Sequence, residues 1–304
     1  MNTNKEQIFL PKKFDCPTLI SFSGGRTSGY MLYKILEAYD YDLPEDVYIT
    51  FCNTGKEMPE TLDFVHDCEK NWGCKIHWLE LDIHEERPIY RTKEVTYETA
   101  SRNGEPFEAL INRKNVLPNP AMRICTVELK INVMKRFMQD KGHTEWANVV
   151  GLRYDEPRRV ASQRRANDKG INKWESLVPL YDAKIMVQDV AEFWEKNHFD
   201  LKLPNFGGKT PAGNCDLCYL KGTQTLVQLL REKPELADWW IQQEENVRKA
   251  QMKKNDLTEE QSYQLATAKW RNNRDYIKLI EIAEDEKKQV TLFDDDGRSC
   301  FCHD

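Results

Sequence analysis

Residues 18–28 are the segment that most limits how this chain can fold. They read Thr-Leu-Ile-Ser-Phe-Ser-Gly-Gly-Arg-Thr-Ser, so a short apolar run passes directly into two glycines. Adjacent glycines permit positive φ angles and a close approach of the main chain to a ligand. The free amide groups at the start of a helix attract negative charge. The segment therefore predicts a buried strand, an anion-binding loop and a helix that begins at Thr27 or Ser28.

The polar side chains of this loop suit a phosphate group, because hydroxyls and a guanidinium donate hydrogen bonds to phosphate oxygens. The candidate phosphate-binding residues are Ser21, Ser23, Gly24, Gly25, Arg26, Thr27 and Ser28. The loop lacks the Lys-Ser/Thr ending of a Walker A loop and does not have the spacing G-x-G-x-x-G. Taken alone, Ser-Gly-Gly is equally compatible with an ordinary turn, so the other motifs of the chain have to decide.

The loop resembles the S-G-G-x-D-S pyrophosphate loop of the adenine nucleotide α-hydrolase (PP-loop) superfamily, with Thr27 at the acidic position. In that superfamily the loop holds the phosphates of ATP while the α-phosphate is attacked. Residues 53–61 read Asn-Thr-Gly-Lys-Glu-Met-Pro-Glu-Thr. They are similar to the D-T-G-x-x-x-x-E-T segment after the second strand of phosphoadenosine-phosphosulfate reductases, with Asn53 in place of Asp.

A third motif points to the same family. Residues 151–159 read Gly-Leu-Arg-Tyr-Asp-Glu-Pro-Arg-Arg and resemble the family element G-x-R-x-x-E-S-x-x-R, with Pro157 in place of Ser. The series of motifs runs in order over about residues 18–220, which is far more specific than any one of them. The resemblance implies that an adenine nucleotide, either ATP or an adenylated sulfate, is bound, with Mg²⁺ as a compatible ion. Beyond the first loop, the residues implied in binding are Asn53, Thr54, Gly55, Gly151 and Arg153.

Strand and helix patterns alternate over the first two-thirds of the chain. Apolar runs suited to a parallel sheet occur at 18–22, 47–51, 76–81 and 148–150, with amphipathic segments near 28–38, 59–72 and 121–139. This alternation predicts an α/β fold with a doubly wound, mostly parallel, Rossmann-like sheet. Ligands bind beyond the carboxyl ends of the strands in such sheets. The loops after the first, second and fourth strands carry the three motifs, so we expect them to converge on one crevice.

Further along the chain the sheet pattern stops. We expect a nucleotide-binding α/β domain over 1–200, a Cys-x-x-Cys loop region over 201–223, a helical region over 224–288 and a mobile, cysteine-containing tail over 289–304. Helix breaks are expected near Pro234 and Asn255. The helical region is a candidate for dimerisation or for holding nucleic acid, and its Trp239-Trp240 pair is expected to be core. Residues 88–120 are expected to be irregular and are a candidate lid.

Three cysteines form a candidate metal site. Two thiolates in the spacing Cys215-x-x-Cys218 can face one soft metal centre, and Cys125 is a natural third ligand. Cys125 lies in a segment that resembles the C-C-x-x-x-K region of assimilatory sulfonucleotide reductases, with Ile124 at the first cysteine. The resemblance implies a [4Fe-4S] cluster for which three ligands carry over. Zinc is the alternative, although it requires a closed tetrahedron and hence a further ligand.

The last residues, Ser-Cys-Phe-Cys-His-Asp, are similar to the E-C-G-x-H tail whose cysteine attacks sulfur in sulfonucleotide reductases. By this resemblance Cys300 is the candidate nucleophile, and Cys302 is an extra thiol that could resolve a persulfide or mixed disulfide. Arg153 completes the candidate catalytic set as a bidentate contact to phosphate or sulfate. Two alternatives stay open for the tail: a disordered end, and a source of the fourth cluster ligand.

Composition limits the setting in which this chemistry would occur. The chain has 304 residues, a net charge of −6 and no apolar run of transmembrane length, so we expect a cytoplasmic protein that does not associate with membranes. Nine cysteines are many for a reducing compartment, where disulfides are rare. The four cysteines expected to serve as inert packing are Cys16, Cys52, Cys68 and Cys74. Residues 153–173 hold seven basic and three acidic side chains, which suits an anionic substrate, a nucleic-acid edge or a solvated helix face.

These motifs support three functions. The first is ATP-dependent activation of an acceptor, forming AMP and pyrophosphate, coupled to sulfur transfer with an iron–sulfur cluster. Its acceptor would be a nucleic acid or a small molecule, and its thiol donor would be a protein such as thioredoxin or a cysteine desulfurase. The second is thiol-dependent reduction of phosphoadenosine or adenosine phosphosulfate with release of sulfite. The third is a non-catalytic nucleotide sensor or partner-binding protein, suggested by Thr27, Asn53 and Ile124 at family positions.

Overall fold

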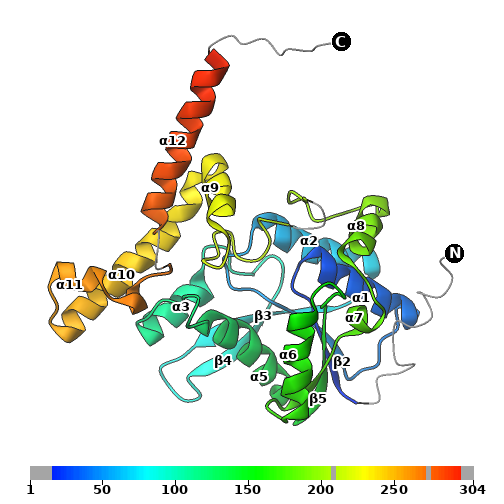
Figure 1. Cartoon of the computed structure of the whole chain (residues 1–304). Helices are drawn as coiled ribbons and strands as arrows, with labels where there is room; N and C mark the ends of the chain where they lie inside the picture. Colours follow the sequence, from blue (N-terminus) through cyan, green and yellow to red (C-terminus); the bar gives the residue numbers. More distant parts are fainter. Residues whose placement is uncertain (1–15, 207–209, 272–274, 296–304) are drawn as a thin grey trace, which may run out of the picture. The chain divides into compact units, whose positions relative to one another are not determined.

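A computed structural model describes residues 16–206, 210–271 and 275–295 of the chain (Figure 1). The chain divides into two compact units. The first, which we call the α/β unit, comprises the chain up to Ala109 together with Cys125–Cys215. The second, which we call the helical unit, comprises Leu110–Ile124 together with the chain from Asp216 onward. The division falls inside the Cys-x-x-Cys motif, and a short segment from the middle of the chain belongs to the helical unit.

The α/β unit is built on a six-stranded sheet with the strand order β4-β3-β2-β1-β5-β6. The strands are β1 (Thr18–Ser21), β2 (Val47–Cys52), β3 (Ile76–Ile83), β4 (Tyr90–Val95), β5 (Trp146–Val150) and β6 (Trp174–Leu177). All neighbouring strands are parallel except β3 and β4. The predicted α/β fold with a doubly wound, mostly parallel sheet is therefore confirmed. The order of the strands reverses at β1, which places a topological switch point beside the first loop.

Helices flank this sheet. They are α1 (Arg26–Ala38), α2 (Pro59–Trp72), α4 (Ile124–Thr126), a π-helical turn (Val127–Ile131), α5 (Asn132–Asp140), α6 (Pro157–Asp168), α7 (Pro179–Asp182) and α8 (Val187–Lys196). Helices α1, α2 and α8 lie side by side (Figure 1). The buried face of α1 carries Met31, Leu32, Ile35 and Leu36, which follow helical spacing.

Residues 88–120 differ from the expectation of an irregular lid. They contain β4 and helix α3 (Glu105–Lys114). Strand β4 pairs antiparallel with β3 from Tyr90 to Val95, and in its first half the exposed Arg91 and Lys93 alternate with the half-buried Tyr90 and Thr92. The expectation failed because the polar residues of an edge strand mask its period of two. The helical segment predicted near 121–139 is present from Ile124 to Asp140, and its middle turn is π-helical.

The helical unit contains α9 (Thr223–Glu232), α10 (Ala237–Asn255), α11 (Glu259–Tyr263), α12 (Tyr276–Asp295) and two short 3-10 turns at Pro234–Leu236 and Ala266–Ala268. The helix breaks expected near Pro234 and Asn255 are confirmed, and α10 ends with Asp256 in the left-handed conformation. Trp240, Trp270 and Tyr276 are fully buried, so the expectation that Trp240 is core is confirmed. In the described part of the chain, no helix has the length and apolar character needed to cross a membrane.

Replacing Gly29 with alanine should destabilise the α/β unit, although alanine is the better helix former. An added Cβ would lie 2.8 Å from Cζ2 of Trp194 and 3.2 Å from Cζ of Phe64, and both rings are buried and pack against each other with centroids 5.0 Å apart. We expect a loss of about 1–3 kcal/mol, the usual cost of overpacking, measured by urea denaturation. The control G222A, whose Cβ would meet no atom closer than 4.0 Å, should change stability by about 0.5 kcal/mol or less. An unchanged midpoint for G29A would contradict the packing of α1 against α8.

The stability of the helical unit should fall as the pH rises through about 7. Glu244 on α10 accepts a hydrogen bond from the Trp270 amide at 3.0 Å, and burial raises the pKa of Glu244 from 4.5 to about 7. A pKa raised by folding stabilises the protein fully below the unfolded value, and this contribution disappears as the pH passes the folded value. Hydrogen exchange of α10 peptides, compared between wild type and E244Q at pH 5 and pH 8, would measure this. Equal pH dependence in both proteins would contradict the assignment.

Candidate functional site

The loop after β1 is held in shape by its own serines. The Ser28 hydroxyl accepts a hydrogen bond from the Ser23 amide at 3.2 Å and donates one to the Gly25 carbonyl at 2.9 Å. Gly24 has a φ of +72°, and an added Cβ would lie 2.8 Å from Cγ2 of Thr61. Gly25 is the N-cap of α1 and supplies no side-chain cap, so no N-cap side chain covers the first amides of the helix. This geometry suits an anion at the helix N-terminus.

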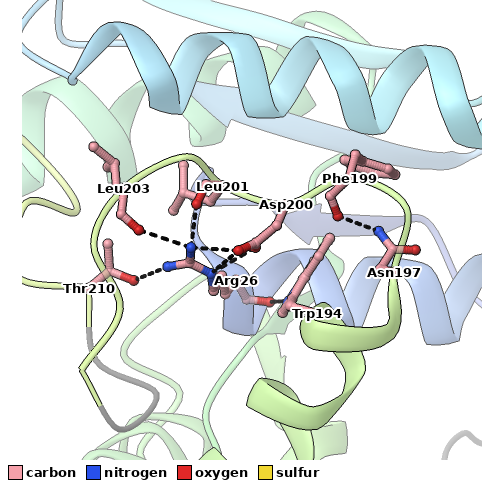
Figure 2. Close-up of polar contacts among 8 residues, drawn as sticks. All are labelled: Arg26, Trp194, Asn197, Phe199, Asp200, Leu201, Leu203 and Thr210. Carbon is pink, nitrogen blue, oxygen red and sulfur yellow. Dashed lines mark hydrogen bonds and ion pairs between the residues drawn. The ribbon is translucent and has the colours of Figure 1, made fainter.

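Arg26 occupies a different place from the one expected of a phosphate ligand. Its side chain is only 6% exposed, and Figure 2 shows its guanidinium surrounded by oxygens of the segment after α8. Nε donates to both carboxylate oxygens of Asp200 at 2.7 and 3.0 Å, and Nη1 donates to Oγ1 of Thr210 at 2.8 Å. Nη2 donates to Asp200 and to the carbonyls of Leu201 and Leu203. Because Asp200 neutralises this charge, Arg26 does not supply a free cation to the loop.

Arg153 and Gly151 join the third motif to the first. An added Cβ at Gly151 would lie 3.2 Å from Cα of Ser28, so the two loops touch through their main chains. Arg153 Nη1 donates to Oγ1 of Thr27 at 2.9 Å, and Arg153 Nε donates to Asp155 at 2.9 Å. The sequence expectation that these loops converge is met for this pair. Thr27, at the family's acidic position, accepts a hydrogen bond from the arginine through its hydroxyl.

Asn53 begins the loop after β2 and is completely buried. Its amide nitrogen donates to Oε1 of Glu80 at 2.6 Å and to the Ser101 carbonyl at 2.8 Å, while its oxygen accepts from the Gly55 amide at 3.1 Å. A carboxylate at position 53 would face the buried carboxylate of Glu80, and two like charges there would repel each other. This explains why an amide is suitable here. Gly55, with a φ of +79°, lies against the main chain of Gly104.

Glu57 and Lys130 form a charge pair that the sequence motifs did not predict. The Glu57 side chain is 2% exposed, and its Oε2 accepts from the amide and the hydroxyl of Thr54 at 2.9 and 2.8 Å. Lys130 Nζ lies 3.8 Å from Oε1 of Glu57. Lys130 sits on the π-helical turn, a feature often found at functional sites. The motif did not point to Lys130 directly, because the lysine position of C-C-x-x-x-K falls on Leu129 and Lys130 is the next residue.

Two of the candidate metal ligands border this charge pair. Cys215 forms an antiparallel bridge with Glu57, and its Sγ lies 3.5 Å from Oγ1 of Thr54. Burial by itself lowers the pKa of Lys130, but the Glu57 carboxylate and the thiols of Cys215, Cys52 and Cys125 outweigh burial, and the net pKa is raised. Cys125 and Cys215 therefore both act on the ammonium group of Lys130 within the α/β unit.

Cys218 belongs to the helical unit, whose core holds the segment around it. The Asp216 carboxylate is buried and accepts from the Trp240 indole nitrogen at 2.8 Å. The Tyr276 hydroxyl donates to the Leu217 carbonyl at 2.5 Å. Among the described residues, no group of three or more His, Cys, Asp or Glu side chains is arranged to hold a metal ion. The candidate set Cys125, Cys215 and Cys218 therefore stays a prediction as a metal site, which rests on the ligand chemistry of thiols alone.

The remaining predicted residues have varied surroundings. Cys52 and Cys68 are buried, and burial raises the pKa of Cys52 to about 12, which agrees with inert packing. Cys16, in contrast, is exposed. Ser21 lies at the end of β1 and donates to Asn148 at 2.9 Å. The candidate catalytic thiols Cys300 and Cys302 lie outside the described residues.

The basic segment is partly neutralised by local pairs. Arg159 pairs with Glu156, and Arg164 Nη2 lies 2.7 Å from Oδ1 of Asp182. These exposed pairs agree with the solvated-face interpretation for the outer arginines, because surface ion pairs of this kind are common and weak. Arg153, which contacts the first loop, stays the candidate for binding an anion.

Replacing Lys130 with methionine should make Cys125 and Cys215 less reactive, because it removes the positive charge that interacts with both groups. We expect alkylation by iodoacetamide at pH 7.5 to slow roughly fivefold at both sites, corresponding to about 1 kcal/mol. The measurement is peptide mass spectrometry on chelator-treated protein, with exposed Cys16 as the internal reference. K130R keeps the charge and should retain near-normal rates. Unchanged rates in K130M would show that Lys130 does not influence these thiols.

Comparison with known proteins agrees with this geometry. The model of the phosphoadenosine phosphosulfate reductase domain family matches residues 17–201. The chain is 30% identical over 215 residues to the nin region protein ORF290 of Escherichia phage lambda, covering 68% of this chain and 67% of that protein. It is 25% identical over 249 residues to the protein MJ0066 of Methanocaldococcus jannaschii, covering 82% of this chain. The match spans 45% of the length of MJ0066.

Among solved structures, the chain is similar to the U34-tRNA thiolase NcsA from Methanococcus maripaludis with its [4Fe-4S] cluster. The identity is 14% and the TM-score is 0.41, with 91% of this chain and 84% of that chain covered. The family match covers the whole sheet and the three motifs that meet beside β1. The chain therefore belongs to the phosphoadenosine phosphosulfate reductase domain family, whose function is nucleotide-binding and sulfur-related.

Proposed function

We propose that this protein is a PP-loop enzyme that binds ATP, transfers AMP to an acceptor with release of pyrophosphate, and couples this activation to sulfur transfer. One observation carries the proposal. In the α/β unit, the glycine loop, the Arg153 loop and the Thr54 loop leave the same edge of the sheet, and the Cys215 thiol lies beside Thr54. A nucleotide-binding loop and a candidate sulfur-carrying thiol thus belong to one compact unit.

The phosphates of the nucleotide would bind at the N-terminus of α1. The amides after Gly25 and the hydroxyls of Ser23 and Ser28 are the donors for phosphate oxygens, and Mg²⁺ would accompany ATP. Arg153 lies next to Thr27 and is paired with Asp155, so it would contact the α-phosphate by exchanging this pair for the phosphate as negative charge develops. The intact Ser-Gly-Gly loop favours ATP, because an adenylated sulfate has no β- and γ-phosphates for such a loop to hold.

Sulfur chemistry in this proposal depends on thiols. Cys125, Cys215 and Cys218 would hold a [4Fe-4S] cluster, since thiolates are the ligands of such clusters, and a bound cluster would supply an iron that can take up sulfide. The proposal rests on this donor set and on the ammonium group of Lys130 near two of the thiols. The acceptor would be a nucleic acid or a small molecule, and a cysteine desulfurase or thioredoxin would supply thiol sulfur or electrons.

A second candidate is thiol-dependent reduction of an adenylated sulfate with release of sulfite. The family match favours it, because the matched model is that of the phosphoadenosine phosphosulfate reductase domain. In this candidate the Cys300 thiol would attack sulfur. The two candidates differ in the nucleotide that the loop accepts, which a binding measurement separates directly.

Calorimetry on anaerobically purified protein should show tighter binding of ATP with magnesium than of adenosine phosphosulfate or phosphoadenosine phosphosulfate. We expect a preference of about tenfold or more, because loss of the β- and γ-phosphate contacts would cost about 1.4 kcal/mol or more. Tighter binding of an adenylated sulfate would favour the reductase instead. Binding of ATP without turnover of any acceptor would favour a nucleotide sensor.

The two loop glycines should respond differently to alanine. In G25A the added Cβ would meet only Oγ of Ser23 at 3.7 Å, so the fold should be kept, while a phosphate lying over Gly25 would be displaced. We expect ATP affinity to fall about tenfold or more in G25A without a change in the melting temperature. In G24A the positive φ and the 2.8 Å contact with Thr61 should lower stability itself. Full ATP affinity in stable G25A would contradict the assigned phosphate site.

A further inference from the structure

Arg26 belongs to the nucleotide loop by sequence, yet all three nitrogens of its guanidinium donate to another segment. The residue is the first of helix α1, directly after the N-cap Gly25. Its main-chain carbonyl accepts a hydrogen bond from the Trp194 indole nitrogen at 2.8 Å, which ties the same turn to α8. Its guanidinium contacts oxygens of Asp200, Leu201, Leu203 and Thr210, as Figure 2 shows. We call this set of contacts the Arg26 clamp.

The clamp uses properties that only arginine has. A guanidinium presents five donors in a planar fork, which here meets a carboxylate, a hydroxyl and two carbonyls from several directions. The side chain is 6% exposed, and Asp200 supplies the opposite charge at 2.7 Å. The Asp200 side chain is 38% exposed, but the buried carbonyls of Leu201 and Leu203 would lose their donor if the guanidinium were removed, and an unpaired buried polar group is costly. The clamp is therefore a strong local restraint on the chain that follows α8.

That chain leads directly to Cys215. Thr210, the last contact of the clamp, begins a turn that is closed by a hydrogen bond from the Gly213 amide to its carbonyl at 3.0 Å. Asn214 follows with a φ of +62°, and Cys215 then forms its bridge with Glu57 and approaches Thr54. Arg26 of the nucleotide loop thus contacts the first residue of the segment 210–215, and the second motif contacts its last residue, Cys215. All of these residues lie within the α/β unit.

We propose that Arg26 is a positioning residue that fixes the Cys215 segment relative to the nucleotide loop. This inference rests on the proposed function, because it gives the Cys215 thiol a role beside the bound nucleotide. Arg26 then positions the segment that it contacts, while Arg153, which is itself paired with Asp155, is the arginine whose guanidinium contacts the first loop. Loss of the Arg26 guanidinium should loosen the approach to Cys215 and leave the phosphate-binding amides in place.

Hydrogen exchange and nucleotide binding together test the proposal on the full chain. In R26M, peptides covering 200–203 and 210–215 should exchange at least about tenfold faster than in wild type, a change equivalent to about 1.4 kcal/mol. Peptides from β3 should keep their protection, and ATP affinity by calorimetry should stay within about twofold. R26K should behave like R26M, because an ammonium group cannot reproduce the fork.

Two results would overturn the inference. The first is a large loss of ATP affinity in R26M with unchanged exchange at 210–215, which would make Arg26 a phosphate ligand. The second is faster exchange confined to 200–203, which would show that the clamp does not reach Cys215. If β3 also exchanges rapidly, R26M is unfolded, and T210V decides instead. It removes only the hydroxyl contact to Nη1, so faster exchange at 210–215 is expected and unchanged exchange there refutes the proposal.

The same experiment separates this inference from the proposed function. The exchange measurements need no nucleotide, so they test the clamp even if the wild-type chain binds neither ATP nor an adenylated sulfate. That result would refute the proposed function alone. Conversely, tight binding of ATP together with unchanged exchange in R26M and T210V would leave the proposed function intact and refute the clamp.

Discussion

The structure depends on the parallel alignment of the central strand with both of its neighbours. Ser21, the last residue of β1, lies opposite Thr50 of β2 and Val150 of β5. Because parallel strands end at one edge of a sheet, the loops after these strands leave the core side by side. The close approach of Gly151 to Ser28 and the hydrogen bond from Arg153 to Thr27 follow from this alignment. Without it, the motifs would be unrelated loops.

Buried charge is the second constraint on this edge of the sheet. Glu80 and Glu57 are both buried. Glu80 accepts hydrogen bonds from Asn53 and Ser101, whereas Glu57 accepts from Thr54 through Oε2 and its Oε1 has no hydrogen-bond partner among the described residues. The side-chain amide of Asn53 donates a hydrogen bond to Glu80. Lys130, which lies on the π-helical turn, offsets the charge of Glu57. A buried carboxylate without such partners would be costly, so these contacts restrict which side chains the motif can contain. The departure of Asn53 from the family pattern is therefore a local electrostatic adjustment.

The Cys-x-x-Cys motif is supported from two directions along the chain. Cys215 is held by the second motif through Glu57 and Thr54, and the Arg26 clamp restrains the segment before it. The residues after Cys215 belong to the helical unit, where Asp216 accepts a hydrogen bond from Trp240 and the Leu217 carbonyl accepts one from Tyr276. The aromatic core of the helical unit therefore holds Asp216 and Leu217 in place, a role that composition alone did not indicate.

The sequence by itself determined the family, the α/β class and the three loops that meet beside β1. These features are local, since apolar periodicity and glycine spacing are set by neighbours along the chain. Tertiary structure alone decided that Arg26 faces Asp200 and Thr210, although it lies inside the phosphate motif. It also decided that Glu57 meets Lys130, and that residues 110–124 belong to the helical unit. These outcomes depend on contacts between residues that are distant in sequence, and no local pattern encodes such contacts.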